Sequence, residues 1–324
     1  MKRVLVIFTG GTISMERSTN QSVVISNGPE EVLNLINNSK SDIQIESKEL
    51  FMKPSPSITL DDMLAIAKFV EESLKDDKYD GIVITHGTDT LEETAYFLDL
   101  YIKSEKPVVL TGSMRNISEL GYDGPANLAS SILVAASKYA MNKGVLLVMN
   151  GEINSAREVT KTHTVALDTF KSLEFGPLGV VDSDNVIFYR DIHLKGNHIH
   201  PEHIEKNVEI VKAYSNADSK IINFLVCEGV KGIIIEGLGR GNVPPMMLDG
   251  IKNAISNGIP VILTSRCVKG RVLDTYGYPG GGHNLKELGV VFGENLNSQK
   301  ARIKLVLALG ISNNIDYLKK IYEL

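Results

Sequence analysis

Three short polar segments, each following an apolar run, carry residue types that could perform chemistry. They are TGGTIS at 9–14, HGTDTLEE at 86–93 and REVTK at 157–161. Because ligands of an open parallel sheet bind beyond the carboxyl ends of its strands, segments in these positions are candidates for one common site. Their threonine hydroxyls, carboxylates and lysine suit nucleophilic and acid–base chemistry.

Two adjacent glycines, Gly10 and Gly11, lie in the first segment. Residues without a Cβ allow a tight turn and bring backbone N–H groups close to a bound anion or oxyanion. A nucleotide loop is a weaker interpretation, because the turn does not match G-x-G-x-x-G and the chain contains no G-x-x-x-x-G-K-[ST]. A purely structural turn is the remaining alternative.

Thr88, Asp89 and Lys161 form a chemically sensible combination in the other two segments. A threonine hydroxyl needs a base, which Lys161 could supply as the neutral amine with Asp89 holding it in place. A solvated or structural Asp–Lys pair is the alternative, since spacing alone does not bring residues 89 and 161 together. Thr90 and Glu93 fit the T-x-x-E capping box, so we expect them to begin a helix.

Short apolar runs rich in valine and isoleucine alternate with helical patterns in the first half of the chain. Such runs, bounded by glycine or proline, fit strands buried on both faces. The alternation predicts right-handed βαβ units and a doubly wound, mainly parallel α/β sheet. The runs cover 4–8, 81–85, 107–111 and 144–149, and the helical patterns include 60–74 and 91–102.

A polar stretch at 191–207 interrupts this pattern and indicates a linker between a larger N-terminal α/β domain at 1–190 and a smaller α/β domain at 208–324. Asn297 is expected to cap a last helix over 299–309. The further strands of the second domain are predicted at 208–214, 232–236 and 260–264.

Composition and charge exclude several kinds of partner. The 324 residues are 43% hydrophobic and 23% charged, which is typical of about two globular domains. A net charge of −5 argues against nucleic acid, whose phosphates require clustered basic residues. No run approaches the ~18 apolar residues of a membrane span, and residues 4–8 are too few for a secretory signal. We therefore expect a soluble cytoplasmic protein.

The cysteines and histidines give no metal or redox pattern. Cys227 and Cys267 are expected to be reduced thiols, with Cys267 a buried small residue. His86 and His163 are expected to orient the backbone or neighbouring side chains rather than transfer protons. A zinc site is not expected from the linker histidines, which are His193, His198, His200 and His203.

Together the polar segments resemble the two active-site signatures of the bacterial L-asparaginase family. The signatures match TGGTI at 9–13 and HGTDTL at 86–91, and the pair is highly specific. The resemblance extends over nearly the whole chain. It continues through VLTGSMR at 109–115, DGPAN at 123–127, SAREVTKTH at 155–163, GLGRGN at 237–242 and LNSQKAR at 296–302.

The resemblance implies hydrolysis of the side-chain amide of L-asparagine to L-aspartate and ammonia, without a metal or organic cofactor. It implies that Thr12 is the nucleophile of an acyl-enzyme and that Thr88, Asp89 and Lys161 form a supporting triad. The family is also tetrameric, a dimer of intimate dimers, and Asn242 matches the residue that completes the neighbouring active site. We therefore expect a homotetramer.

The same resemblance implies how the substrate is held. Backbone N–H groups near Gly11 and Thr88 would bind the oxyanion. Ser55 matches the serine that holds the α-carboxylate, Asp89 would bind the α-ammonium group, and Ser113 joins the substrate-binding set.

Two departures from the family pattern affect these expectations. Many secreted relatives carry a tyrosine in the loop after the first signature, whereas residues 15–30 contain none. The polar loop at 15–24 is a candidate lid, and our hypothesis is that Tyr276 or Tyr278 supplies the missing hydroxyl from the adjacent subunit. No acid aligns at 280–283, where those relatives place a substrate-contacting glutamate, which leaves minor glutaminase activity open.

Two other functions stay open from the sequence. One is the amidase component of a tRNA-dependent amidotransferase, although that form normally carries an additional N-terminal segment. The other is a non-catalytic amino-acid-binding homologue, which would be expected to lose at least one residue of the proposed machinery, namely Thr12, Thr88, Asp89 or Lys161.

Overall fold

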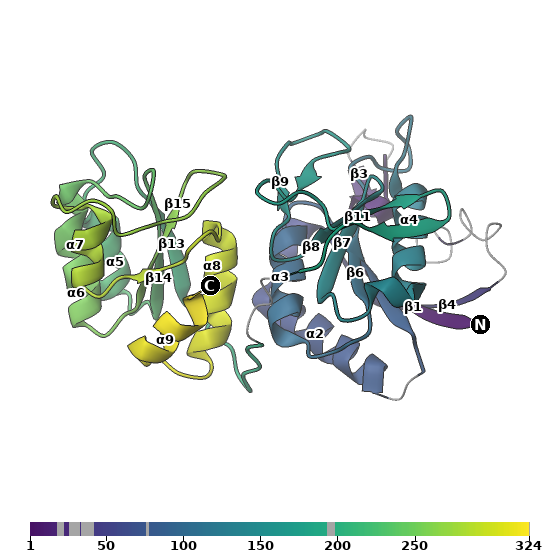
Figure 1. Cartoon of the computed structure of the whole chain (residues 1–324), viewed down its shortest axis with the longest axis horizontal. Helices are drawn as coiled ribbons and strands as arrows, with labels where there is room; N and C mark the ends of the chain where they lie inside the picture. The colour runs from purple at the N-terminus through teal and green to yellow at the C-terminus, as the bar shows by residue number, and fades with distance from the viewer. Residues whose placement is uncertain (18–22, 26–32, 34–41, 76–77, 193–197, 324) are drawn as a thin grey trace. The chain divides into compact units, whose positions relative to one another are not determined.

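An eight-stranded sheet organises the first of two compact units, Met1–His198, and the second unit is Ile199–Leu324. The computed structural model describes residues 1–324 except 18–22, 26–32, 34–41, 76–77, 193–197 and 324 (Figure 1). The strands of the large sheet, in spatial order, are β12 (Asn185–Phe188), β11 (Gly179–Asp182), β8 (Glu152–Ser155), β7 (Val145–Met149), β6 (Val108–Thr111), β5 (Gly81–Thr85), β1 (Lys2–Gly10) and β4 (Ile43–Lys53).

The five strands from β7 to β4 are parallel, and the edge formed by β8, β11 and β12 is antiparallel. The central strands β5, β6 and β7 are buried along their whole length, because helices cover both faces of the sheet. The predicted doubly wound, mainly parallel sheet is therefore confirmed.

Alternate side chains of β1 serve the two faces of this sheet. Val4, Val6 and Phe8 belong to the buried cluster that includes residues of α4 (Gly124–Ala136). Helices α3 (Leu91–Tyr101) and α2 (Leu60–Lys75) lie on the other side of the sheet (Figure 1). Both helices match the ranges predicted from the helical pattern to within one residue.

Short elements decorate the loops of the first unit. β2 (Met15–Arg17) pairs with β3 (Val23–Ile25) inside the predicted lid, of which residues 18–22 lie outside the described part of the chain. β9 (Thr160–Lys161) pairs with β10 (Phe170–Lys171). Single 3-10 turns occur at η1 (Thr12–Ser14), η2 (Ser55–Ser57) and η3 (Lys138–Ala140).

The second unit is a four-stranded parallel sheet. Its strands are, in spatial order, β13 (Val208–Lys212), β14 (Gly232–Gly237), β15 (Val261–Ser265) and β16 (Val291–Phe292). Its helices are α5 (Lys220–Cys227), η4 (Pro245–Met247), α6 (Leu248–Ser256), α7 (Gly282–Glu287), α8 (Ser298–Leu309) and α9 (Ile315–Tyr322). Asn297 caps α8 by accepting a hydrogen bond from the Lys300 N–H, as predicted.

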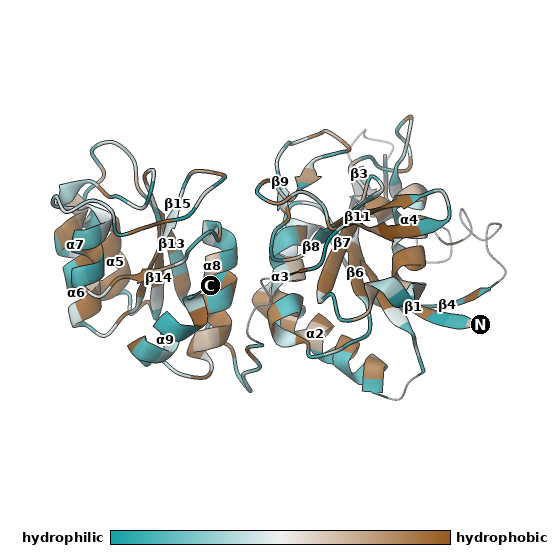
Figure 2. Cartoon of the chain, viewed as in Figure 1, coloured by the Kyte–Doolittle hydropathy of each residue, from teal (hydrophilic) through white to brown (hydrophobic). Residues whose placement is uncertain are grey.

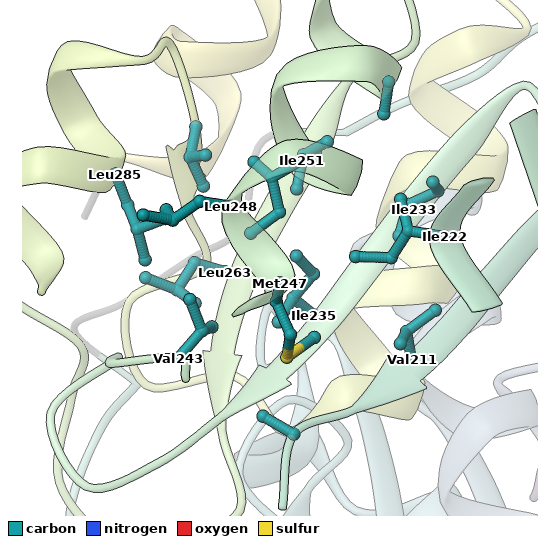
Figure 3. Close-up of a cluster of buried hydrophobic side chains, with 14 of the residues drawn as sticks. Val211, Ile222, Ile233, Ile235, Val243, Met247, Leu248, Ile251, Leu263 and Leu285 are labelled. Carbon is teal, nitrogen blue, oxygen red and sulfur yellow. The ribbon is translucent and has the colours of Figure 1, made fainter. Parts of the chain in front are cut away.

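Apolar side chains from strands and helices form the core of this second unit. Ile233 and Ile235 of β14, Leu263 of β15 and Ile251 of α6 are fully buried together (Figure 3). Figure 2 shows the same arrangement in both units, with brown, apolar strands inside and teal, hydrophilic surfaces on the outer helices. The division between the units falls within the polar stretch at 191–207.

Two whole-chain features bear on function. Among the described helices, none is long and apolar enough to cross a membrane. No cluster of three or more histidine, cysteine or acidic side chains in the described residues could hold a metal ion, and His193 of the linker group lies outside them. The expectation that Cys267 is buried is wrong: both cysteines are free and exposed, and Cys267 lies in the exposed loop after β15.

Candidate active site

The ends of β1 and β5 bring the first two polar segments together. These strands are parallel neighbours with Phe8 opposite Thr85, so segments 9–14 and 86–93 leave the sheet at the same edge. The Thr9 hydroxyl donates a hydrogen bond to the Thr85 carbonyl at 2.7 Å. This bond joins the two segments at their first residues.

The backbones of Gly11 and Gly87 touch where the segments cross. Gly10 and Gly11 have φ angles of 101° and 87°, in the left-handed region that favours glycine. A Cβ on Gly11 would lie 2.3 Å from the Gly87 nitrogen and 2.5 Å from its Cα, closer than real atoms approach. The crossing therefore requires glycine, and it brings into contact the backbones that carry Thr12 and Thr88.

Lys161 reaches this crossing from β9. Its Nζ lies 3.0 Å from Thr88 Oγ1 and 2.8 Å from Asp89 Oδ1, although Lys161 is more than 70 positions from both residues in the chain. The Lys161 side chain is 17% exposed and that of Asp89 is 62% exposed. The combination expected from chemistry is thus assembled, with the lysine enclosed and the carboxylate open to a ligand.

Thr12 occupies the first position of η1 and is half-buried. Within the described part of the chain, its hydroxyl forms no hydrogen bond. The Gly11 N–H donates to the Lys53 carbonyl at 3.1 Å, so Gly11 itself cannot donate to an oxyanion. The backbone N–H groups of Thr12 and Thr88 have no partner among the described residues and are available as donors at the crossing.

Ser55 lies beside the same crossing, in the turn η2. It is buried, its Oγ accepts a hydrogen bond from the Asp89 N–H at 3.1 Å, and a Cβ on Gly87 would lie 2.7 Å from that oxygen. The serine expected to hold a substrate carboxylate is therefore next to the carboxylate expected to hold a substrate ammonium group.

The capping box correctly predicted where α3 begins. Thr90 does occupy the N-cap position of α3, but its side chain accepts no hydrogen bond there. Its hydroxyl instead donates to the Ser55 carbonyl at 2.9 Å. This bond to an acceptor 35 residues earlier in the chain is one that the local pattern does not indicate. Thr90 thus ties η2 to the segment that carries Asp89.

Gly112 and Ser113 extend the site to the next strand, β6. A Cβ on Gly112 would lie 2.5 Å from the His86 carbonyl oxygen and 3.5 Å from Thr88 Cγ2. Ser113 is fully buried, and its hydroxyl donates to the Arg115 carbonyl at 2.8 Å. The close approach of Gly112 is a contact that the sequence analysis missed, and the glycine in VLTGSMR was its only signal.

His86 orients the backbone of the second segment, as expected. It is fully buried, with Nδ1 2.8 Å from the Gly87 carbonyl oxygen and Nε2 2.9 Å from Thr94 Oγ1. Because a carbonyl can only accept, Nδ1 carries the proton and Nε2 accepts from Thr94. Burial lowers the pKa of His86 to about 4, so the ring is neutral near pH 7.

Acidification should therefore destabilise the first unit through His86. In the unfolded state His86 becomes protonated below about pH 6.5, whereas in the native state it stays neutral until about pH 4. Between these two pH values the unfolded state therefore binds more protons than the native state. Stability due to this group is complete above pH 6.5, and about 3 kcal/mol is lost as the pH falls to 4. Urea unfolding across this range should show a smaller pH slope for His86→Gln, whose amide can keep both hydrogen bonds. Equal slopes for the two proteins would contradict the prediction.

The remaining predicted residues lie elsewhere. His163 is exposed, and its Nδ1 accepts from the Val165 and Ala166 N–H groups, so it orders its own loop as expected. In the second unit, Tyr276 and Tyr278 are 41% and 51% exposed, with ring centroids 5.5 Å apart. Asn242 follows β14, and its Oδ1 is buried without a partner among the described residues.

Comparisons with known proteins agree over the whole chain. The family model for the N-terminal asparaginase domain matches residues 3–194, and the model for the glutaminase/asparaginase C-terminal domain matches residues 207–322. The L-asparaginase of Bacillus licheniformis is 39% identical over 312 residues, which cover 95% of each chain.

Two further comparisons are similarly complete. A probable periplasmic L-asparaginase of Haemophilus influenzae is 36% identical, with 100% of this chain and 93% of that protein covered. The crystal structure of a probable cytoplasmic L-asparaginase from Campylobacter jejuni is 33% identical, covers 99% of each chain and superimposes with a TM-score of 0.89. With both family models matched in order along a chain whose fold and signatures agree, the chain belongs to the asparaginase family.

Proposed function

We propose that the protein is an L-asparaginase that hydrolyses the side-chain amide of L-asparagine to L-aspartate and ammonia through an ester on Thr12. The observation that carries this proposal is the position of Lys161 Nζ, within hydrogen-bond distance of both Thr88 and Asp89 beside the Gly11–Gly87 crossing. A homologue that only binds an amino acid would not require a mostly buried lysine, such as Lys161, within hydrogen-bond distance of a threonine hydroxyl, such as that of Thr88.

In the proposed reaction, the Thr12 oxygen attacks the carbon of the substrate's side-chain amide, and the proton of the Thr12 hydroxyl passes to Lys161, the base. The N–H groups of Thr12 and Thr88 stabilise the oxyanion, a contribution of ~3 kcal/mol per donor in other enzymes. Lys161 takes up the proton through Thr88 and returns it to the departing ammonia. Water then hydrolyses the ester by the same relay in reverse.

Asp89 and Ser55 hold the amino-acid end of the substrate. The exposed Asp89 carboxylate binds the α-ammonium group while it keeps its bond to Lys161. Ser55 Oγ already accepts from the Asp89 N–H, so its own proton is available to the α-carboxylate. Ser113 and Asn242 complete the substrate-binding set. One methylene separates glutamine from asparagine and is worth only ~1 to 3 kcal/mol, so minor glutaminase activity accompanies the main reaction.

The proposal includes assembly and location. The protein is a homotetramer in the cytoplasm, and Asn242 reaches the active site of the neighbouring subunit. The reaction uses no metal or organic cofactor. The net charge of −5 supports a small-molecule substrate rather than a nucleic acid.

Ammonia release from L-asparagine, L-glutamine and D-asparagine tests the function directly. We expect L-asparagine to give the highest kcat/KM and Thr12→Ala to abolish release from all three. Comparable rates for the wild type and Thr12→Ala would overturn the mechanism, and no release from any amide by the folded wild type would overturn the function.

The hydroxyl that assists Thr12 is assigned to Tyr276, with Tyr278 as the alternative. Tyr276→Phe should lower kcat about a hundredfold, as expected for loss of one proton-transfer group. Both side chains are partly exposed, so the free energy of unfolding should change by no more than about 0.5 kcal/mol. Steady-state kinetics of each single variant checks this, and unchanged turnover in both would reject the assignment.

A further inference from the structure

The turn that carries Thr12 has little internal support. η1 contains three residues and follows two glycines with φ angles of 101° and 87°. Its local backbone bonds run from the Ser14 N–H to Gly11 and from the Met15 N–H to Thr12. Because glycine leaves the chain free to adopt many conformations, the orientation of the turn depends on contacts from outside it.

Three such contacts reach the turn from other parts of the first unit. The Lys53 carbonyl accepts from the Gly11 N–H at 3.1 Å, before the turn, and the Met15 carbonyl accepts from the Ile117 N–H at 3.1 Å, after it. The contact at the centre of the turn comes from Tyr122, whose hydroxyl donates to the Ile13 carbonyl at 2.6 Å. Among the described residues, no other side-chain bond is closer in sequence to Thr12.

Tyr122 is itself held firmly. Its ring lies so close to Gly124 that a Cβ there would fall 2.3 to 2.4 Å from three atoms of the phenol. The neighbouring Asp123 carboxylate accepts from the Met114 and Arg115 N–H groups at 3.0 and 2.9 Å. Burial, with a smaller contribution from Asp123, raises the pKa of the Tyr122 phenol, so the hydroxyl keeps the proton that it donates.

The same connection also supports Thr88. Asn127 donates to the Gly112 carbonyl at 3.0 Å and to the Asp123 carboxylate at 2.9 Å. Gly112 in turn packs against the His86 carbonyl and the methyl group of Thr88. The segment between β6 and α4 therefore touches both threonine-bearing loops, through Tyr122 on one side and Gly112 on the other.

We propose that Tyr122 is a positioning residue for catalysis: its hydrogen bond to the Ile13 carbonyl fixes the turn of Thr12 against the loop of Thr88. The inference rests on the proposed role of Thr12 as nucleophile. Tyr122 acts through the backbone and touches no reacting atom in this scheme. A displacement of about 1 Å can cost a hundredfold in rate, so loss of this bond should appear in turnover rather than in substrate binding.

Tyr122→Phe removes the hydroxyl and keeps the ring over Gly124. We expect kcat to fall about tenfold to a hundredfold while KM stays within about twofold, since Ser55 and Asp89 do not contact Tyr122. Tyr79→Phe is the matched control, because the Tyr79 hydroxyl also makes a 2.6 Å bond, to Glu46, away from the site. That variant should melt at a similar temperature to Tyr122→Phe and turn over at the wild-type rate.

The outcomes separate this inference from the proposed function. A folded Tyr122→Phe that keeps at least half the wild-type kcat overturns the positioning role, and so does an equal loss of kcat in Tyr79→Phe. Neither result would bear on the role of Thr12 as nucleophile, which Thr12→Ala tests separately. If Tyr122→Phe does not fold, Gly124→Ala keeps the hydroxyl but drives the ring from its place, and it should lower kcat at unchanged KM. Wild-type turnover in a folded Gly124→Ala overturns the inference as well.

Discussion

Replacing Lys161 with methionine should lower kcat about a hundredfold to ten-thousandfold, the range expected when a general acid–base group is lost. The Lys161 Nζ lies within hydrogen-bond distance of both Thr88 Oγ1 and Asp89 Oδ1, and methionine matches its length without a proton to exchange. Stability should change little, because the Asp89 end of the ion pair is open to solvent and such pairs contribute about 0 to 1 kcal/mol. Steady-state kinetics and thermal melting measure the two effects separately.

Lys171→Met provides the matched control for that experiment. Lys171 lies in β10, paired with the strand of Lys161, and forms a 2.7 Å ion pair with Glu152. It has no contact with Thr88 or Asp89 in the described structure, so its removal should leave kcat unchanged. A Lys161→Met enzyme within tenfold of the wild type, or an equal loss in Lys171→Met, would contradict the role of Lys161.

The strands that position the site were predictable because they are buried on both faces. Strands whose two faces are both buried have continuous apolar sequences, as in β5, β6 and β7, and such runs can be recognised without a structure. The edge strand β4 escaped prediction, since only one of its sides pairs and exposed polar residues interrupt its apolar ones. The two-residue strands β9 and β10 are too short to leave any pattern.

The site itself was predictable in its chemistry but not in its contacts. The residue types of Thr88, Asp89 and Lys161 indicated a nucleophile, a carboxylate and a base, yet their meeting depends on the fold of the loops after β8. The same limit explains why the bond from Thr90 to the distant Ser55 carbonyl was not predicted. It also explains why Tyr122 was not singled out, because its bond to Ile13 spans 109 positions.

Thr12→Ala should abolish turnover, with a fall in kcat of about 10⁴ to 10⁶ comparable to removal of a nucleophile in other hydrolases. Thr12 is half-buried and its hydroxyl has no hydrogen-bond partner in the described part of the chain, so its loss leaves no unsatisfied group behind. The free energy of unfolding should therefore stay within about 1 kcal/mol of the wild type. A very large fall in kcat with almost no change in the free energy of unfolding is the result expected when a nucleophile is removed.

Thr12→Ser tests whether the oxygen at this position is what matters. Serine keeps the oxygen and loses only the methyl group that restricts the side-chain rotamer, so we expect measurable turnover, well above that of Thr12→Ala. Acid quenching during turnover of L-asparagine, followed by peptide mass spectrometry, should find the aspartyl ester on residue 12 in the wild type and never in Thr12→Ala. An ester found on Thr88 instead would assign the nucleophilic role to Thr88. More than about 1% of wild-type turnover in a folded Thr12→Ala would also contradict the role of Thr12, because a water molecule activated by Lys161 cannot replace the attacking hydroxyl at that rate.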